Sequence, residues 1–598
     1  MKADGRMTSA LACWVMMAVF VLGLVYLGVR LKTVQLDSAA ELKLAEQRQS
    51  LRRVQTAGGR GRILDRRGEL LAGNRVTVSI VCDAAAFRRR TWTATAAAIR
   101  EAVDEVARVI GRPAALEDAK IRRHLRQTLA MPLTVWNDVD RATLARFCEH
   151  ARELPGFAVV EREERIYPQG SLAAHVIGYV GRELASSEAG DTGFHFRERE
   201  LCGRAGLEIY YDSYLRGVAG ERKLLVDARG FTHGGWTVAA ARRGPDLRLA
   251  LDSALQRAVE SELAGEKGAC VVLDPRDGSV LAMASSPTYD LRSCVPFLPH
   301  SFYKALCADP SQPTINRAVM GAYAPGSTFK PVTAVAALST GHSAHACYQC
   351  DGVYTLGGMK LHCTRRWGHG ILDLKSALKF SCNPFFCNLG VEVGTNALFT
   401  AAREFGLGAR TGIDLKGEEP GLVPDDAWKF SHYGDRWRTG DLAQMSIGQG
   451  MLLATPLQMA LVAGAIGTGY AVRPHLKLGL DAERRPLDFP SWALMHVRQG
   501  MEKVVNDPDG TGRRGGAGLP VRIAGKTGTA EVGAGERKRK NTWFIAYAPA
   551  EKPTLAVAMV IENGDSGGGT TAPKVHNVLA AAFGPGGVFD ATDERRRR

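Results

Sequence analysis

The chain has 598 residues, which is too long for one ordinary domain and predicts two to four. Its composition, 45% hydrophobic and 23% charged residues, is that of a folded protein and excludes a fibrous or wholly disordered chain. The formal net charge is +15, yet no nucleic-acid-binding motif or basic–aromatic interleaving accompanies it. An anionic membrane or polymer surface is therefore the better partner for the positive charge.

An unbroken apolar run of 20 residues covers positions 10–29. At about 1.5 Å per residue, a helix of this length spans a bilayer core of about 30 Å. No small-residue cleavage site follows it, so the run is interpreted as an uncleaved anchor rather than a signal peptide. Basic residues flank it on both sides, so their distribution does not set the orientation. We expect a cytoplasmic tail at 1–9, an anchor at 10–30 and a juxtamembrane stalk with helical spacing at 31–58.

The next segment, 59–240, is predicted to be a domain without chemistry of its own. Residues 59–74 read as a strand, a turn at 66–68 and a returning strand. Residues 98–153 alternate amphipathic helical patterns with short breaks. We interpret the segment as a structural spacer, with partner docking as its one expected activity.

The remainder, 241–585, is predicted to be a domain built on antiparallel strands. Apolar runs predict a hairpin at 269–284, strands at 542–548 and 554–561, and a helix at 574–583. A disordered basic tail is expected at 586–598, ending in the run Arg595–Arg598.

Ser327 and Lys330 lie in residues 323–330 (YAPGSTFK), a stretch that predicts a turn opening a helix through residue 338. Three residues apart, they share one helical face. A serine hydroxyl needs an adjacent base near neutral pH, and a lysine whose pKa is lowered by burial can serve. The start of a helix also offers unpaired N–H groups where an acyl oxyanion develops. The pattern S-x-x-K by itself is common in a chain of this length and identifies no site.

Two further stretches follow it in order. Ser381-Cys-Asn383 comes after a helical pattern at 372–380, and Lys526-Thr-Gly-Thr529 lies in a predicted strand. S-x-x-K, S-x-N and K-T-G in this order resemble the active-site set of penicillin-binding proteins and serine β-lactamases. The middle motif here is S-C-N, whereas the common form is S-D-N.

The resemblance extends over residues 59–583 and narrows the family. Residues 59–74 resemble the opening of the non-catalytic pedestal of class B penicillin-binding proteins, while 367–370 (WGHG) and 445–458 resemble the elongation type, penicillin-binding protein 2. The resemblance implies an α+β architecture: one transmembrane helix, an elongated pedestal (dimerisation-like) domain, and a transpeptidase domain whose antiparallel sheet is flanked by helices and interrupted by an all-helical insert. It also implies a periplasmic catalytic domain anchored in the inner membrane.

The implied activity is a peptidoglycan D,D-transpeptidase that cross-links stem peptides during cell elongation and is inhibited by β-lactams. By this resemblance Ser327 attacks the D-Ala-D-Ala carbonyl, and Lys330 is the base. Ser381 and Lys526 relay a proton to the leaving amine, and Asn383 orients Lys330. The residues that hold the substrate backbone and its terminal carboxylate are Thr527, Gly528 and Thr529. The N–H groups of Ser327 and Thr529 form the implied oxyanion hole.

Five of the twelve cysteines crowd into residues 347–387. Cys347-x-x-Cys350, followed by Cys363 and His369, is close to the spacing of zinc ligands. Some elongation-type relatives hold a structural zinc, and the resemblance assigns its ligands to Cys350, Cys363, His369 and Cys382. The open alternatives are Cys347 in place of one ligand, a Cys347–Cys350 disulfide or a Cys363–Cys382 disulfide. The implied metal is structural, and the chemistry requires no cofactor.

The resemblance implies a polytopic SEDS-type glycosyltransferase and rod-complex scaffold proteins as partners, besides stem peptides and β-lactams. Two alternative functions use the same motifs. A D,D-carboxypeptidase or β-lactam hydrolase would release the acyl group to water, but no deacylating glutamate can be identified. A non-enzymatic β-lactam sensor or scaffold would carry several membrane segments and a cytoplasmic effector domain. The sequence does not indicate the acceptor amine or the third residue of the stem peptide.

Overall fold

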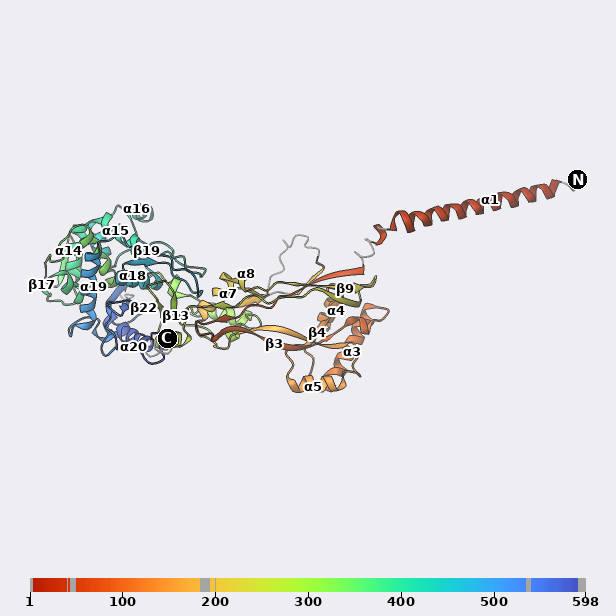
Figure 1. The fold of residues 1–598 in the computed structure, drawn as a ribbon, viewed down its shortest axis with the longest axis horizontal. Coiled ribbons are helices and arrows are strands. Elements are labelled where there is room, and N and C mark those ends of the chain that lie inside the picture. Colours follow the sequence, from red (N-terminus) through yellow and green to blue (C-terminus); the bar gives the residue numbers. More distant parts are fainter. Residues whose placement is uncertain are drawn as a thin grey trace.

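The computed structural model describes residues 4–39, 41–43, 50–182, 194–198, 201–533 and 539–589. The molecule is elongated, with a long helix at one end, a narrow middle part and a rounded body at the other end (Figure 1). Residues 590–598, which contain most of the expected basic tail, lie outside the described part of the chain.

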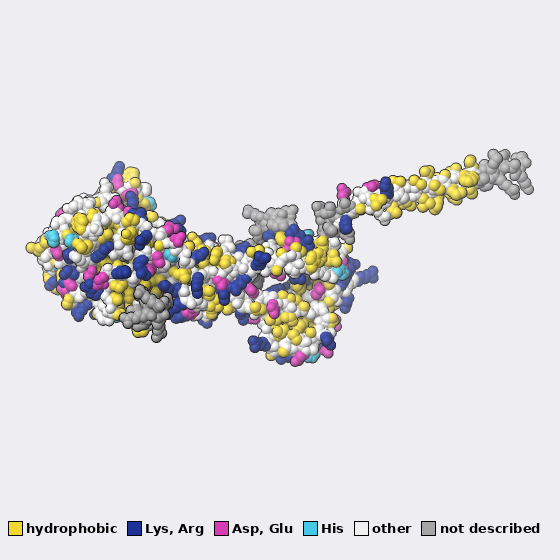
Figure 2. Space-filling view, in the orientation of Figure 1, with side chains coloured by type: hydrophobic (Ala, Val, Ile, Leu, Met, Phe, Trp, Pro, Cys, Tyr) yellow, Lys and Arg dark blue, Asp and Glu magenta, His cyan; other side chains and the backbone are white. Residues whose placement is uncertain are grey.

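The long helix is α1 (Asp4–Lys32), which continues into the short π-helical turn η1 (Thr33–Asp37). The side chains of residues 11–32 are almost all exposed, and hydrophobic atoms cover this rod (Figure 2). Over Leu11–Asp37 the helix is long and apolar enough to cross a membrane. An apolar helix with no protein around it is stable only in lipid or a comparable apolar environment, as the sequence predicts for this segment.

The expected helical stalk ends earlier than its pattern indicated. Strand β1 (Leu51–Thr56) lies within it and pairs antiparallel with β9 (Gly220–Val226) and parallel with β7 (Phe196–Arg197). Backbone partners on both sides come from segments more than 130 residues away in the sequence. Tertiary pairing therefore overrides a local helical pattern that has no other support.

The middle part of the molecule consists of two larger narrow sheets and a two-stranded sheet, β6 with β8, with helices beside them. The first has the order β10-β9-β1-β7, and the second has the order β11-β2-β3-β4, with β5 also paired to β3. The remaining strands are β2 (Ile63–Leu64), β3 (Leu70–Cys82), β4 (Leu133–Trp136), β5 (Phe157–Ile166), β6 (Val180–Arg182), β8 (Leu201–Gly203), β10 (Thr232–Ala239) and β11 (Leu247–Arg248). The helices are η2 (Ala84–Phe87), α3 (Trp92–Ile110), α4 (Asp118–Gln127), α5 (Arg141–His150), α6 (Ala174–Ile177), α7 (Gly206–Tyr210) and α8 (Asp212–Leu215).

A buried ion cluster holds this middle part together. Glu208, which is fully buried, accepts hydrogen bonds from Arg60 at 2.6 Å and from Arg165 at 2.8 Å. Arg60 also pairs with Asp212 at 2.8 Å. Because unpaired buried charges cost several kcal/mol, each member of the cluster depends on the others.

The rounded body is built on a five-stranded antiparallel sheet in the order β13-β12-β22-β21-β20. Helices α9 and α20 contact each other and cover one face, while α18 packs against strands β12, β21 and β22. Their bounds are β12 (Gly268–Leu273), β13 (Val280–Ser286), β20 (Ala524–Val532), β21 (Arg539–Ala548), β22 (Leu555–Glu562), α9 (Ser253–Leu263), α18 (Pro456–Thr468) and α20 (Ala572–Phe583). The sheet strands and helices expected from the sequence are therefore present.

A long insert between β13 and β20 carries two of the three motifs. Its helices are η3 (Leu291–Cys294), α10 (His300–Ala308), α11 (Arg317–Met320), η4 (Gly326–Phe329), α12 (Lys330–Ser339), α13 (Leu374–Lys379), α14 (Asn383–Val393), α15 (Thr395–Glu404), α16 (Asp426–Tyr433), α17 (Thr439–Ser446), α19 (Ser491–Asn506) and η5 (Arg513–Gly515), and η7 (Gly567–Thr571) follows β22. The insert is therefore mainly helical, as the resemblance implies, but it is not all-helical. It also has three two-stranded pieces: β14 (Tyr348–Cys350) with β17 (Gly370–Leu372), β15 (Val353–Leu356) with β16 (Met359–His362), and β18 (Tyr470–Val472) with β19 (Arg484–Pro486).

Candidate active site

Ser327 lies on η4, a single 3-10 turn, and not in the first turn of the predicted long helix. The α-helix α12 begins only at Lys330. Gly326 opens the turn with a φ of +55°, a conformation that favours glycine, and a Cβ there would lie only 3.0 Å from Thr529 O. The 3-10 geometry still aligns residues three apart, so Ser327 and Lys330 keep the common face that the spacing predicts.

The Lys330 ammonium group is fully buried and surrounded by acceptors. Its Nζ donates to Ser381 O at 2.7 Å and to Asn383 Oδ1 at 2.7 Å, and lies 3.3 Å from Ser381 Oγ. Burial lowers the pKa of Lys330 to about 8. A neutral amine has two N–H groups and one lone pair. The two shortest contacts use both N–H groups, which leaves the lone pair to accept a proton.

Ser381 brings the second lysine into the same network. Lys526 Nζ donates to Ser381 Oγ at 2.9 Å and to Thr527 O at 2.9 Å. Burial, and then the charge of Lys330, hold the pKa of Lys526 well below its ordinary value. Ser381 itself has a φ of +56°, a strained conformation for a residue with a side chain. In this conformation its hydroxyl lies between the two lysines, 2.9 Å from Lys526 Nζ and 3.3 Å from Lys330 Nζ.

A cleft of 1190 Å³ opens beside these groups, and Ser327, Ser381 and Asn383 line it. Strand β20 forms one wall with Thr527, Gly528 and Thr529, all of which the sequence predicts as substrate-binding residues. At Gly528 a Cβ would lie 2.8 Å from the side chain of Thr328, so only glycine lets η4 approach the strand. The structure thus brings all eight predicted catalytic and substrate-binding residues to one cleft or directly behind it.

Thr511 and Gln449 are among the further cleft residues that the sequence did not predict. Thr511 Oγ1 accepts a hydrogen bond from Thr527 Oγ1 at 3.0 Å, and Gln449 Nε2 donates to Thr529 O at 3.4 Å. Gln449 lies in residues 445–458, and the resemblance of this stretch to the elongation type is the signal that could have identified it. Thr511 follows an exposed loop and has no motif around it.

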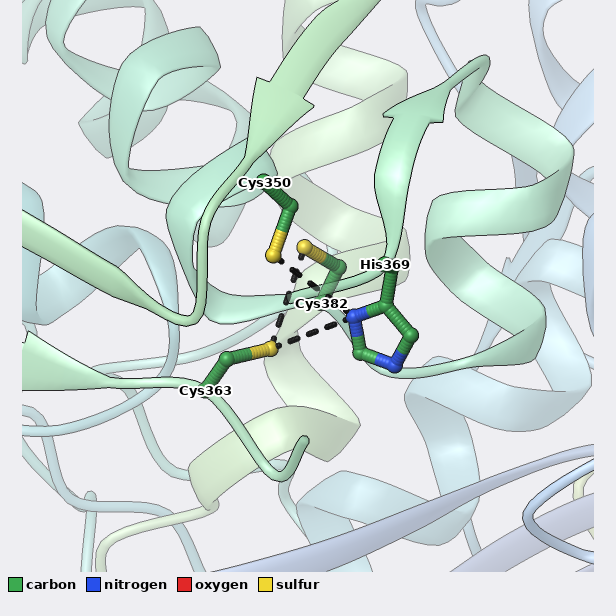
Figure 3. Close-up of side chains that lie close together, drawn as sticks. All are labelled: Cys350, Cys363, His369 and Cys382. Carbon is green, nitrogen blue, oxygen red and sulfur yellow. Dashed lines mark hydrogen bonds between the residues drawn. The ribbon is translucent and has the colours of Figure 1, made fainter. Parts of the chain in front are cut away.

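The four predicted metal ligands meet in one cluster. Figure 3 shows three thiols and one imidazole pointing toward a common centre. Their ligand atoms all lie within 4.8 Å of one another, and they are Cys350 Sγ, Cys363 Sγ, His369 Nδ1 and Cys382 Sγ. The separations are 3.6 Å from Cys350 to His369, 3.4 Å from Cys363 to His369 and 3.9 Å from Cys363 to Cys382.

These separations fit a tetrahedral zinc ion. With Zn–S of about 2.3 Å and Zn–N of about 2.0 Å, the edges of the tetrahedron are about 3.8 Å between sulfurs and about 3.6 Å between sulfur and nitrogen. The hydrogen bond between Cys363 and Cys382 lowers the pKa of Cys363 and raises the pKa of Cys382, so the pair favours one thiolate, the form in which cysteine binds a metal. Cys347 does not join it, because its side chain is exposed and donates to His345 O.

Family comparisons match almost the whole chain after the long helix. Residues 55–249 match the penicillin-binding protein dimerisation domain, and residues 268–580 match the penicillin binding protein transpeptidase domain. The peptidoglycan D,D-transpeptidase MrdA of Escherichia coli K12 is 34% identical over 547 residues, covering 86% of this chain and 85% of the relative. MrdA of Haemophilus influenzae is 32% identical, covering 87% and 83%.

Solved structures agree with these matches. A complex of penicillin-binding protein PBP2 and MreC from Helicobacter pylori matches with a TM-score of 0.77 and 26% identity, over 88% of this chain and 98% of that one. Pseudomonas aeruginosa PBP2 in complex with WCK 5153 matches with a TM-score of 0.66 and 28% identity, over 89% and 97%. Domain order, motif geometry and these likenesses agree: the chain belongs to the class B penicillin-binding proteins, in the PBP2 branch whose relatives are named peptidoglycan D,D-transpeptidase MrdA.

Proposed function

We propose that the protein is a peptidoglycan D,D-transpeptidase that works through a Ser327 acyl-enzyme. The observation that carries the proposal is the arrangement behind Ser327: the Lys330 amine is fully buried, has a pKa near 8, and uses its N–H groups on Ser381 and Asn383. An amine in this state is a base within one helical turn of the hydroxyl it deprotonates.

In the acylation step, the Ser327 oxygen attacks the carbonyl between the last two residues of a D-Ala-D-Ala stem peptide. Its proton passes to Lys330 Nζ, and the oxyanion accepts hydrogen bonds from the backbone N–H groups of Ser327 and Thr529. The carbon–nitrogen bond then breaks. The departing amine takes a proton from the Ser381 hydroxyl, which the neighbouring lysines replenish at 2.9 Å and 3.3 Å.

In the second step the amine of another stem peptide attacks the ester carbonyl. Lys330 accepts a proton from this amine, and the Ser327 oxygen leaves with one, so the enzyme returns to its starting state. Water in place of the amine yields a D,D-carboxypeptidase side reaction. A β-lactam enters by the first step, and the acyl group that it leaves on Ser327 blocks the second.

The substrate is proposed to lie along β20. Gly528 gives the substrate backbone room at the strand edge, and the hydroxyl groups of Thr527 and Thr529 hold the terminal carboxylate, whose negative charge favours the protonated form of Lys526 behind them. Asn383 keeps one N–H of its amide for the substrate, since its Nδ2 already donates to His362 O at 2.7 Å.

A structural zinc at the Cys350, Cys363, His369 and Cys382 cluster is part of the proposal. Bound there, the ion supplies a cross-link and no reaction step, because all four ligands come from the protein. Cys382 stands between Ser381 and Asn383, so the cross-link fixes the loop that presents both to Lys330. The transpeptidase chemistry itself needs no cofactor.

The relatives support a proposal for the cellular setting. The Helicobacter pylori relative is solved with MreC, and another match, with a TM-score of 0.72 and 30% identity, belongs to a peptidoglycan synthase complex. We propose that α1 anchors the protein in the inner membrane, with the pedestal at 59–240 and the catalytic domain at 241–585 on the periplasmic side. A SEDS-type glycosyltransferase and a rod-complex scaffold are the proposed partners.

The test is the intact mass of the full-length protein in detergent after exposure to a penicillin. A single adduct of the drug's mass is expected, and Ser327→Ala should lose it. An adduct that persists in the variant, or none on the folded wild-type protein, refutes the assignment of Ser327. Release of many equivalents of hydrolysed drug would instead favour a hydrolase.

A further inference from the structure

Trp367 is 77% exposed, the largest exposed fraction of any large hydrophobic side chain that the structure describes. It lies on the turn between Cys363 and His369, and nothing in the proposed reaction uses it. An indole exposed to this degree loses the gain from burial that usually selects tryptophan. Trp367 is therefore a candidate for ligand binding.

The turn that carries Trp367 is rigid. Gly368 N donates to Arg365 O at 3.0 Å, and His369 N donates to Cys350 O at 3.0 Å. A Cβ at Gly368 would lie 2.0 Å from Cys350 O, so the turn packs directly against the strand that carries a cluster ligand. The indole is consequently held out into solvent by ordered backbone, which lowers the entropy cost of binding a ligand there.

The side chains around Trp367 combine an aromatic ring with positive charge. The Arg365 guanidinium lies over the indole, 5.4 Å from the ring centre, which leaves the opposite ring face to solvent. Residues 348–372 contain three basic residues (Lys360, Arg365 and Arg366) and one acidic residue, Asp351. The surface therefore favours a ligand with flat apolar faces and carboxylates.

This surface is continuous with the active-site cleft. Lys360, Thr364 and Arg366 line the cleft, so Trp367 directly follows a cleft residue in the chain. Strand β17, which follows the turn, lies at the end of the molecule farthest from α1 (Figure 1). The surface therefore belongs to the end of the molecule that is farthest from the proposed membrane anchor.

We propose that Trp367 and Arg365 form a subsite for the glycan strand to which the stem peptide is attached. The C–H face of an amino-sugar ring stacks on the free face of the indole, and the arginine side chains pair with carboxylates carried by the strand. The inference rests on the proposed function, which supplies the substrate. Continuity with the substrate cleft, which Arg366 lines, favours the strand of the substrate over a separate protein partner.

The experiment measures binding of peptide-free glycan strands, prepared from peptidoglycan, to the full-length protein in detergent. Trp367→Ala is expected to weaken binding about tenfold, because it removes one stacking contact of about 1.4 kcal/mol. Trp367→Phe should recover part of the affinity. Trp492→Ala is the matched control, since Trp492 is also exposed, at 44%, but lies on α19. Thermal unfolding of each variant checks that it is folded.

The outcomes separate this inference from the proposed function. Equal strand binding by wild type and Trp367→Ala overturns the subsite, as does an equal loss in Trp492→Ala. Ser327→Ala should bind strands like the wild type, because the subsite does not include the nucleophile. If the wild-type protein forms no penicillin adduct, the proposed function is refuted. Formation of this adduct does not depend on glycan binding.

Discussion

The burial of Lys330 predicts a pH dependence of acylation that an ordinary lysine would not give. Removal from water lowers its pKa to about 8, and only the neutral amine can accept the serine proton. At pH 6 about 1% of the amine is neutral, and at pH 8 about half is neutral. The acylation rate is therefore expected to rise about 50-fold between these values and to level off above pH 9.

A second perturbation tests whether Lys330 is the group that titrates. Asn383→Asp replaces an amide oxygen 2.7 Å from Lys330 Nζ with a carboxylate. A negative charge at this distance raises the pKa of a lysine by about 1–3 units. The midpoint of the pH profile should therefore move upward in this variant, and the rate at pH 7 should fall by about tenfold or more.

The assay is the rate of acylation by a fluorescent penicillin, measured from pH 6 to 10 under single-turnover conditions. The lowered pKa of Lys330 also affects stability. Because the folded state binds the Lys330 proton more weakly than the unfolded chain does, the fold is destabilised at any pH at which the unfolded chain is protonated. This cost is fully present below about pH 8 and disappears as the pH rises toward 10.5, so the free energy of unfolding should rise over this window. A flat rate profile, or an Asn383→Asp midpoint that does not move, refutes the assignment of Lys330 as the base.

Three further predictions concern the metal cluster, the nucleophile loop and the pedestal. Cys363→Ser is expected to abolish binding of about one zinc per chain and to lower the thermal midpoint of unfolding. Cys347→Ser should change neither the zinc content nor the midpoint. Elemental analysis measures the zinc content, and calorimetry measures the midpoint. Gly448→Ala places a Cβ 2.0 Å from Gly326 O at a φ of +73°, so it should slow penicillin acylation and destabilise the fold by about 2 kcal/mol or more. Glu208→Gln leaves the buried Arg165 without a carboxylate and Arg60 with Asp212 alone, and it should destabilise the fold by about 3–5 kcal/mol in denaturant melts.

A specific result would contradict each of these three predictions. Zinc retained by Cys363→Ser, or lost from Cys347→Ser, would contradict the ligand set. An acylation rate in Gly448→Ala equal to that of the wild type would show that the loop tolerates a displaced backbone. A Glu208→Gln melt within about 1 kcal/mol of wild type would mean that the arginines find other partners or water.

Local sequence already determined much of the fold. Turn-flanked apolar runs predicted the sheet hairpin and the strand of Lys526, because strand periodicity and turn chemistry are local properties. The long apolar run likewise predicted α1. The segment 51–56 shows the limit: its neighbours suggested a helix, but the strands that pair with it lie far along the chain, and a window of local sequence cannot contain them.

At the site, short motifs were enough to predict which residues carry the chemistry, since S-x-x-K, S-x-N and K-T-G each keep their reactive groups within a few residues. How these groups contact one another depends on the tertiary structure. The lowered pKa of Lys330 comes from burial by distant segments. The position of Ser381 between two lysines depends on a strained backbone conformation that the surrounding fold maintains. The positions of Thr511 and of the turn that carries Trp367 also depend on the tertiary structure. Their neighbours are set by packing between segments far apart in the chain, and such packing leaves no local pattern to read.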